Sequence, residues 1–435
     1  MAIKPARLTM RCYGVGFGDC FLLTFHYAGS TGDRHVMIDF GSTQSPPNAE
    51  KNQMNLIATD IATVVGKPLH VLVATHRHAD HINGFATNAS KTGTGDIIAA
   101  LEPQLVIQPW TERPDAPEDF IGTGKQDSMK GADDALRLSL TRMGVVAAAA
   151  AKEARHLAAT ERSEIQFVAA DGVANMSAVK NLARMGKKTK AAYVQYGSKI
   201  PALKTLLPGI DVSILGPPTV KQKADVLNQK PVNKKEYWHF AHFWALRAAN
   251  ANTRPDAPVL FPDAEVYRTL REMPIESRWF VRRQRALRGQ QLLGLVRSMD
   301  DALNNTSVIL LFAAGKKKLL FPGDAQWENW ELALNKNAAE LKDVDIYKVG
   351  HHGSLNATPK TLWNGFTNRS DKKDTPGRLV TVMSTRSDSK HGHPESKTEV
   401  PRSTLVTELK ENSLHRSTQE LEADGGVVLK LEFDL

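Results

Sequence analysis

Residues 75–84 read Thr-His-Arg-His-Ala-Asp-His-Ile-Asn-Gly, so three histidines and one aspartate stand within six residues. The segment follows an apolar run at 68–74 that is typical of a buried strand. Imidazole and carboxylate together suit zinc, iron or manganese. We therefore expect a metal-binding loop at a strand end, in which His76 and His78 face one metal while Asp80 and His81 face a second. A solvated turn is the alternative.

The flanking sequence predicts alternating strands and helices. Apolar runs and glycine turns predict strands at 8–12, 20–25, 35–38, 68–74, 105–107, 210–216, 307–312, 318–321, 344–349 and 378–383. Helical patterns stand at 50–65 and 326–341. The order of strands, helix and strands occurs twice, which favours two β-sheets packed face to face with helices outside.

The composition bounds the class of protein. The chain has 435 residues, 41% of them hydrophobic and 24% charged, which is ordinary globular usage. We expect no membrane association and a cytoplasmic location, because no apolar run approaches a membrane span and the first residues lack a secretory signal. The two cysteines, Cys12 and Cys20, cannot form a disulfide framework or an all-thiolate zinc site.

The domain organisation follows from shifts in composition. We expect residues 1–220 and 301–435 to form the two halves of one fold. An alanine-rich helical insertion is predicted at about 120–165 within the first half. Residues 221–300 change towards arginine and aromatic residues with several prolines, which predicts an inserted helical, Arg-rich subdomain.

The His-x-His-x-Asp-His spacing after a strand resembles the signature of the metallo-β-lactamase superfamily. Two further stretches resemble motifs of the same family. In Val36-Met37-Ile38-Asp39-Phe40-Gly41, Asp39 would support the metal loop, and in Leu319-Leu320-Phe321-Pro322-Gly323-Asp324-Ala325, Asp324 would bridge both metals. The resemblance implies an α+β fold, the αβ/βα sandwich of this superfamily.

Four pieces resemble one branch of that superfamily, the metal-binding domains of ComEC-type DNA-uptake proteins and of phosphorylcholine esterases. They are Val15-Gly16-Phe17-Gly18-Asp19, Asn305-Thr306-Ser307-Val308, Lys348-Val349-Gly350-His351-His352-Gly353-Ser354 and Gly392-His393-Pro394. By this resemblance His351 and His352 would hold the substrate phosphate or protonate the leaving group, with a direct metal bond as the alternative. His393 would complete the metal held by Asp80 and His81.

The family pattern includes one more histidine, which would complete the metal held by His76 and His78. The candidates here are His156, His239 and His242, and none stands in a recognisable motif. A packed or exposed histidine is the favoured interpretation for each of them. We therefore expect this metal to have only three protein ligands, which leaves the two-metal stoichiometry open.

Positive charge favours acidic partners. The chain carries a formal charge of +9, and arginines interleaved with aromatic residues crowd the stretch from Arg268 to Arg297. Such a pattern is typical of a surface that binds phosphates and stacks on bases. We expect the substrate-binding arginines to be Arg278, Arg282, Arg283 and Arg285. A solvated helix face is the equally weighted alternative.

These observations predict a metal-dependent hydrolase that uses a metal-bound hydroxide, with two zinc ions, or with manganese or iron in their place. His351, His352 and Asp324 would be catalytic. Phosphodiesters are the expected substrate class, with nucleic acid as the partner if the protein is a nuclease. The alternatives are a hydrolase of carboxylic esters, lactones or amides, and a catalytically idle module that binds metal or nucleic acid.

Overall fold

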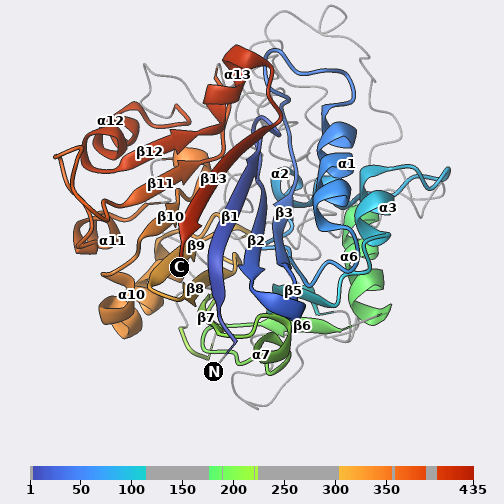
Figure 1. Ribbon diagram of the computed structural model, residues 1–435, viewed down its shortest axis with the longest axis horizontal. Coiled ribbons are helices and arrows are strands. Elements are labelled where there is room, and N and C mark those ends of the chain that lie inside the picture. Colours follow the sequence, from blue (N-terminus) through green and yellow to red (C-terminus); the bar gives the residue numbers. More distant parts are fainter. Residues whose placement is uncertain are drawn as a thin grey trace, which may run out of the picture. The chain divides into compact units, whose positions relative to one another are not determined.

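The computed structural model describes residues 3–113, 176–188, 190–219, 221–223, 303–354, 358–387 and 399–435. All of these residues belong to one compact unit. Within it, two β-sheets pack face to face and helices cover their outer faces (Figure 1). The expected αβ/βα sandwich is thereby confirmed. The predicted insertions at about 120–165 and at 221–300 lie almost entirely outside the described residues, so the division into domains stays a prediction.

The first sheet has seven strands in the order β13-β1-β2-β3-β4-β5-β6. The strands from β13 to β3 pair antiparallel, and those from β3 to β6 pair parallel. Their bounds are Pro5–Tyr13 (β1), Cys20–Tyr27 (β2), Arg34–Phe40 (β3), Val71–Val73 (β4), Leu105–Pro109 (β5), Ala191–Val194 (β6) and Val428–Asp434 (β13).

The second sheet has six strands in the order β12-β11-β10-β9-β8-β7. The strands β7, β8 and β9 pair antiparallel, whereas those from β9 to β12 pair parallel. Their bounds are Ile210–Gly216 (β7), Ile309–Ala314 (β8), Lys317–Phe321 (β9), Ile346–Lys348 (β10), Val380–Met383 (β11) and Leu414–Ser417 (β12).

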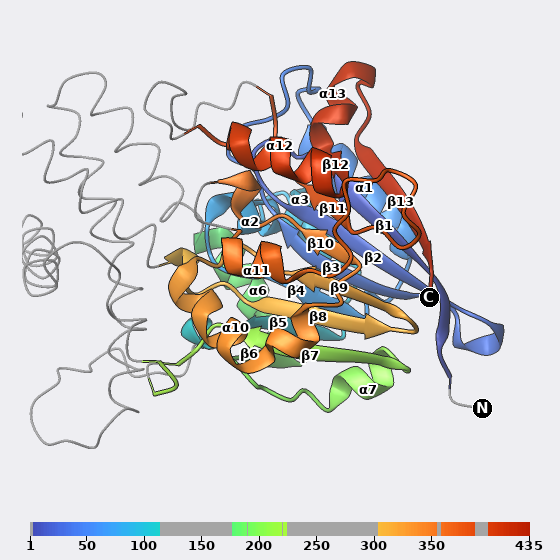
Figure 2. The same cartoon turned by 90° about the vertical axis from the view of Figure 1, so that its left-hand side faces the viewer.

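The helices divide between the two outer faces (Figure 1 and Figure 2). The first sheet is covered by Gln53–Val65 (α1), Thr94–Ala99 (α3) and Met176–Lys188 (α6), and the second by Trp327–Leu341 (α10), Lys360–Gly365 (α11) and Ser403–Asn412 (α12). Three short helices are Ala79–Ile82 (α2), Ala202–Leu206 (α7) and Leu421–Asp424 (α13). None of the helices in the described part of the chain has the length and apolar character that a membrane span requires.

Strand β2 shows why the central strands are apolar almost throughout. Phe21, Leu23 and Phe25 face the core between the two sheets. Cys20 and Leu22 alternate with them and face the helices outside. Because both faces of the sheet are buried, both sets of alternating side chains must be apolar.

Two buried histidines on the first sheet make its stability depend on pH. His35 N–H donates to Nδ1 of His70 over 3.1 Å, and Nη1 of Arg34 lies 2.8 Å from Nε2 of His70. Burial lowers the pKa of both imidazoles to about 4; the Arg34 charge adds to this shift, mainly at His70, while Asp33 partly opposes it at His35. Between about pH 4 and the ordinary pKa of histidine, the unfolded chain therefore binds more protons than the folded one.

We therefore expect the metal-free protein to lose stability as the pH falls from 6.5 to 4. His70→Gln removes one of these imidazoles, so the free energy of unfolding of the variant should change less steeply with pH. The slope should differ by up to the contribution of one bound proton. Urea unfolding at several pH values, with chelator present for both proteins, measures the difference. Equal slopes for the parent and the variant would contradict this explanation.

Candidate metal centre

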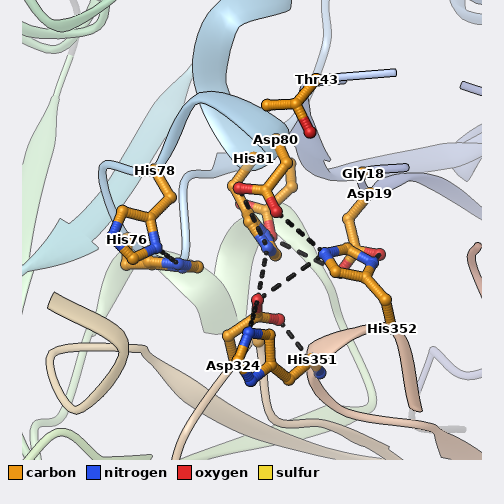
Figure 3. Close-up of polar contacts among 12 residues, drawn as sticks. Gly18, Asp19, Thr43, His76, His78, Asp80, His81, Asp324, His351 and His352 are labelled. Carbon is orange, nitrogen blue, oxygen red and sulfur yellow. Dashed lines mark hydrogen bonds and ion pairs between the residues drawn. The ribbon is translucent and has the colours of Figure 1, made fainter. Parts of the chain in front are cut away.

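The acids and imidazoles lie at or just beyond the carboxyl ends of four strands. Asp39 is the penultimate residue of β3, and the 75–84 segment follows its parallel neighbour β4. In the second sheet, Asp324 follows β9, and the His351-His352 pair follows its parallel neighbour β10. Parallel neighbours end at the same edge of a sheet. The two edges meet, and Figure 3 shows the resulting group of acids and imidazoles.

Asp39 holds the loop after β4 in place. Its Oδ1 accepts a hydrogen bond from Thr75 N–H, and its Oδ2 accepts one from the Thr75 hydroxyl, both over 2.7 Å. The same Oδ2 lies 2.8 Å from Nδ1 of His81. Asp39 has a φ of +57°, an unfavourable conformation for a non-glycine residue that is typical of functional sites. Asp39 therefore contacts both Thr75 and His81 of this loop, and its support of a bound metal stays a prediction.

Four buried side chains converge on one point. Nε2 of His81 lies 3.0 Å from Oδ2 of Asp324, and Nε2 of His352 lies 3.0 Å from Oδ2 of Asp80. Two further separations, from His352 Nε2 to Oδ2 of Asp324 and from His81 Nε2 to Oδ1 of Asp80, are 3.7 and 3.9 Å. Donor atoms at tetrahedral zinc are about 3.3 Å apart, given bonds of about 2 Å. Each of the four residues can offer one donor atom, all within 4.8 Å of one another, so the group could hold one cation.

The remaining ring nitrogens of this group have partners that orient them. Nδ1 of His81 faces Asp39, and Nδ1 of His352 lies 3.0 Å from the backbone carbonyl oxygen of Ser384. A histidine that binds a metal usually donates its other N–H to such an acceptor. Both imidazoles therefore direct Nε2 towards the carboxylates.

His76 and His78 form a second pair beside the first group. Nε2 of His76 lies 3.1 Å from Nδ1 of His78, and Nδ1 of His76 lies 3.2 Å from the hydroxyl of Thr75. The ring centroids of His76 and His81 are 4.2 Å apart, so the pair adjoins the four-residue group. The structure thus brings together all four residues that the 75–84 segment predicted.

The protonation of these groups is set by burial and by their neighbours. Burial lowers the pKa of His76 and His78, which favours the neutral form that binds metal. Burial opposes charge on Asp324, but the imidazoles around it, above all His81, hold the pKa of this carboxyl well below its usual range. Burial also opposes charge on His81, but the surrounding acids raise its pKa well above the usual value.

The pKa values of His352 and Asp80 shift for the same reasons as those of His81 and Asp324. Burial opposes both charges, yet Asp324 raises the pKa of His352, and His81 lowers the pKa of Asp80. The metal-free centre therefore holds protons on two imidazoles. A metal ion must displace those protons, so metal affinity should weaken in acid.

The donor set fits divalent metal ions. Oδ1 of Asp80 is buried and makes no hydrogen bond within the described residues. Four carboxylates, those of Asp19, Asp39, Asp80 and Asp324, are buried in and around the centre. Buried carboxylates are costly unless cations compensate them. Imidazole with carboxylate is also the ligand chemistry of zinc, iron and manganese.

Two of the quoted motifs position this centre. The Ser307 hydroxyl accepts a hydrogen bond from Asp324 N–H over 3.2 Å, and Val308 N–H donates to the Thr75 carbonyl. At the other motif, Asp19 N–H donates to the Asp80 carbonyl, and the Phe17 ring lies 4.5 Å from that of His352. Both motifs therefore contact the segments that carry the acids.

The turn at Gly323 brings Asp324 against the 75–84 segment. Gly323 has a φ of +56°, and a Cβ there would come within 2.9 Å of the Thr75 Cβ. Only glycine meets both conditions without strain.

The adjacent histidines of the HHG segment lie differently. His352 is fully buried among the acids, whereas the side chain of His351 is 21% exposed and its Nε2 lies 3.9 Å from Oδ2 of Asp324. Their φ values are +51° and +42°, so the backbone is strained at both. For His352 this position favours the direct metal bond over contact with substrate. His351 lies at the rim, where it can reach a substrate.

Two buried charges were not singled out by sequence reasoning. Lys348 is only 2% exposed and forms an ion pair with Asp19, a residue quoted only as part of a motif. The sequence feature that could have pointed to them is their position in the motifs at 15–19 and 348–354. The remaining expected site residues lie outside the described residues and stay predictions: His393, the candidates His156, His239 and His242, and the arginines Arg278, Arg282, Arg283 and Arg285.

Comparison with known proteins agrees with this geometry. Residues 13–143 match the model of the Metallo-beta-lactamase superfamily. The match includes β2, β3, β4 and the whole 75–84 segment. No curated protein matches the chain. Residues 13–143 therefore resemble a metallo-β-lactamase superfamily domain. This resemblance and the buried acids and imidazoles suggest a metal-dependent hydrolase.

Proposed function

We propose that this protein is a metal-dependent phosphodiesterase. The observation that carries the metal-dependent part is the convergence of Asp80, His81, Asp324 and His352 within 4.8 Å of one another. These residues would hold one ion. His76 and His78, together with Asp324, would hold the other. Zinc fits the imidazole-rich donor set, and manganese or iron would fit it as well.

Bound divalent ions would supply an activated water molecule and polarise the scissile group. The chain itself supplies the orientation. Asp39 and the Ser384 carbonyl hold the imidazoles of His81 and His352, as their hydrogen bonds indicate. His351, at the rim, would bind a phosphate oxygen or donate a proton to the leaving oxygen.

A phosphodiester is the proposed substrate for two reasons. The motifs at 15–19, 305–308 and 348–354 resemble those of a branch that acts on phosphoesters, and the net charge of +9 favours an anionic substrate. A nuclease is the sharpest form of this proposal, with Arg278, Arg282, Arg283 and Arg285 as candidate contacts to a polyanion.

The test is a substrate screen with metal-loaded protein. Bis(4-nitrophenyl) phosphate, 4-nitrophenyl acetate, a lactone and single-stranded DNA would be assayed after loading with Zn²⁺ or Mn²⁺. Chelated protein and the His76→Ala, His78→Ala double variant are the controls. We expect turnover of the phosphodiester that both controls lose. Turnover of the acetate or lactone alone would favour a hydrolase of carboxylic esters or lactones. Bound metal without any turnover would favour a catalytically idle metal-binding module.

A further inference from the structure

Lys348 is a buried cation inside the proposed metal centre. It is the last residue of β10 and stands three residues before His351. Its ammonium forms an ion pair with Oδ2 of Asp19, donates to the Gly323 carbonyl over 3.2 Å and lies 3.6 Å from Oδ1 of Asp324. Burying a lysine is energetically costly unless its partners compensate the charge. A buried lysine at this position therefore implies a role other than packing.

The two carboxylate oxygens of Asp324 face different groups. Oδ1 faces Lys348 and accepts a hydrogen bond from His351 N–H over 3.1 Å. Oδ2 instead faces the imidazoles, 3.0 Å from Nε2 of His81 and 3.7 Å from Nε2 of His352. The ammonium and the backbone N–H thus fix the rotation of the carboxylate. Only Oδ2 is left for a metal.

We propose that Lys348 is a positioning residue of the metal centre, which holds Asp324 so that one oxygen alone is offered to metal. The proposal rests on the proposed function, because it assumes that cations bind this group. Its simpler rival is that Lys348 only neutralises Asp19, a carboxylate that lies behind the rings, 3.5 Å from Nδ1 of His352. In the first role Lys348 acts on the carboxylate of Asp324, and in the second it acts only on that of Asp19.

A pair of variants separates these roles. Lys348→Met alone would leave Asp19 buried without its partner, which can unfold the protein. Asp19→Asn therefore serves as the matched background, and Asp19→Asn with Lys348→Met is the test variant. Removing both members of a buried pair is tolerated better than removing one. Circular dichroism and thermal unfolding of the metal-free proteins establish that both are folded.

Zinc affinity is measured by competition with a chromophoric chelator, and the absorption spectrum of the Co²⁺-loaded protein reports the coordination. We expect the double variant to bind zinc about 10- to 100-fold more weakly than Asp19→Asn, the range for loss of a supporting contact. Its Co²⁺ bands should also change, because Oδ1 of Asp324, held then only by the His351 N–H, can turn towards the metal.

Equal zinc affinity and equal Co²⁺ spectra in the two variants would overturn the proposal in favour of the simple ion pair. Tighter binding by the double variant would also overturn it, since Lys348 would then act only by repelling the metal. No substrate enters these measurements. A parent protein that binds metal but hydrolyses nothing therefore defeats the proposed phosphodiesterase and leaves this test in force, whereas a parent that binds no metal overturns both.

Discussion

Asp80→Asn and Asp324→Asn should each reduce hydrolysis to the level of the chelated protein. Both carboxylates lie at the point where His81 and His352 converge. Loss of a supporting contact to a metal ligand costs about 10- to 100-fold in affinity or activity. Loss of a ligand itself should cost more than about 100-fold. Metal content by elemental analysis and the rate with the best substrate of the screen measure the effect.

Asparagine is the informative replacement because it preserves shape. Asp324 pairs with His81 and Lys348, so alanine would leave a cavity beside two buried cationic groups and confound stability with catalysis. Asp60→Asn is a matched control: its carboxylate accepts a hydrogen bond from Tyr13 on the first sheet and is not part of the metal centre. Full activity in either test variant would rule out this centre as the site of hydrolysis.

His351→Ala and His352→Ala should differ in kind although the residues are adjacent. His352 is buried among the acids, so its loss should release metal. His351 is partly exposed at the rim, so its variant should keep metal while turnover falls by about 10² to 10⁴, the range for a positioned acid or base. Metal content and kcat, measured on the same preparations, distinguish the two.

The reverse pattern, with metal lost from His351→Ala and retained by His352→Ala, would exchange the two roles. If both variants kept metal and full turnover, the HHG segment would have no part in the chemistry. Rescue of His351→Ala by added imidazole would support proton transfer rather than a purely structural effect.

The central strands could be predicted because their pattern is local. The apolar runs at 20–25, 35–38 and 318–321 correspond to β2, β3 and β9. Strands β6, β12 and β13 were not predicted. In β13, Lys430, Glu432 and Asp434 are exposed and alternate with Leu429, Leu431 and Phe433, and the strand exists because it pairs with β1 more than 400 residues earlier in the chain. The alternation is itself typical of a half-buried strand, so β13 could have been predicted from it, and only its pairing with β1 depends on the tertiary structure.

The candidate ligands of the 75–84 segment could be recognised because they lie within one loop. Their spacing alone limits where four donor atoms can point. The choice between a substrate contact and a metal bond for His352 could not be made in that way. It depends on Asp80, 272 residues away in the chain, whose Oδ2 lies 3.0 Å from Nε2 of His352.

The ion pair of Asp19 and Lys348 is a further long-range contact that the local sequence does not predict. Neither a lone aspartate in a glycine turn nor a lone lysine at a strand end predicts a buried ion pair, because exposed charges are far commoner in sequences. Only the packing of one sheet on the other removes both side chains from water and forces them to compensate each other. Short-range spacing therefore identified the candidate metal-binding loop, whereas the long-range contacts of the sandwich assigned each charge its partner.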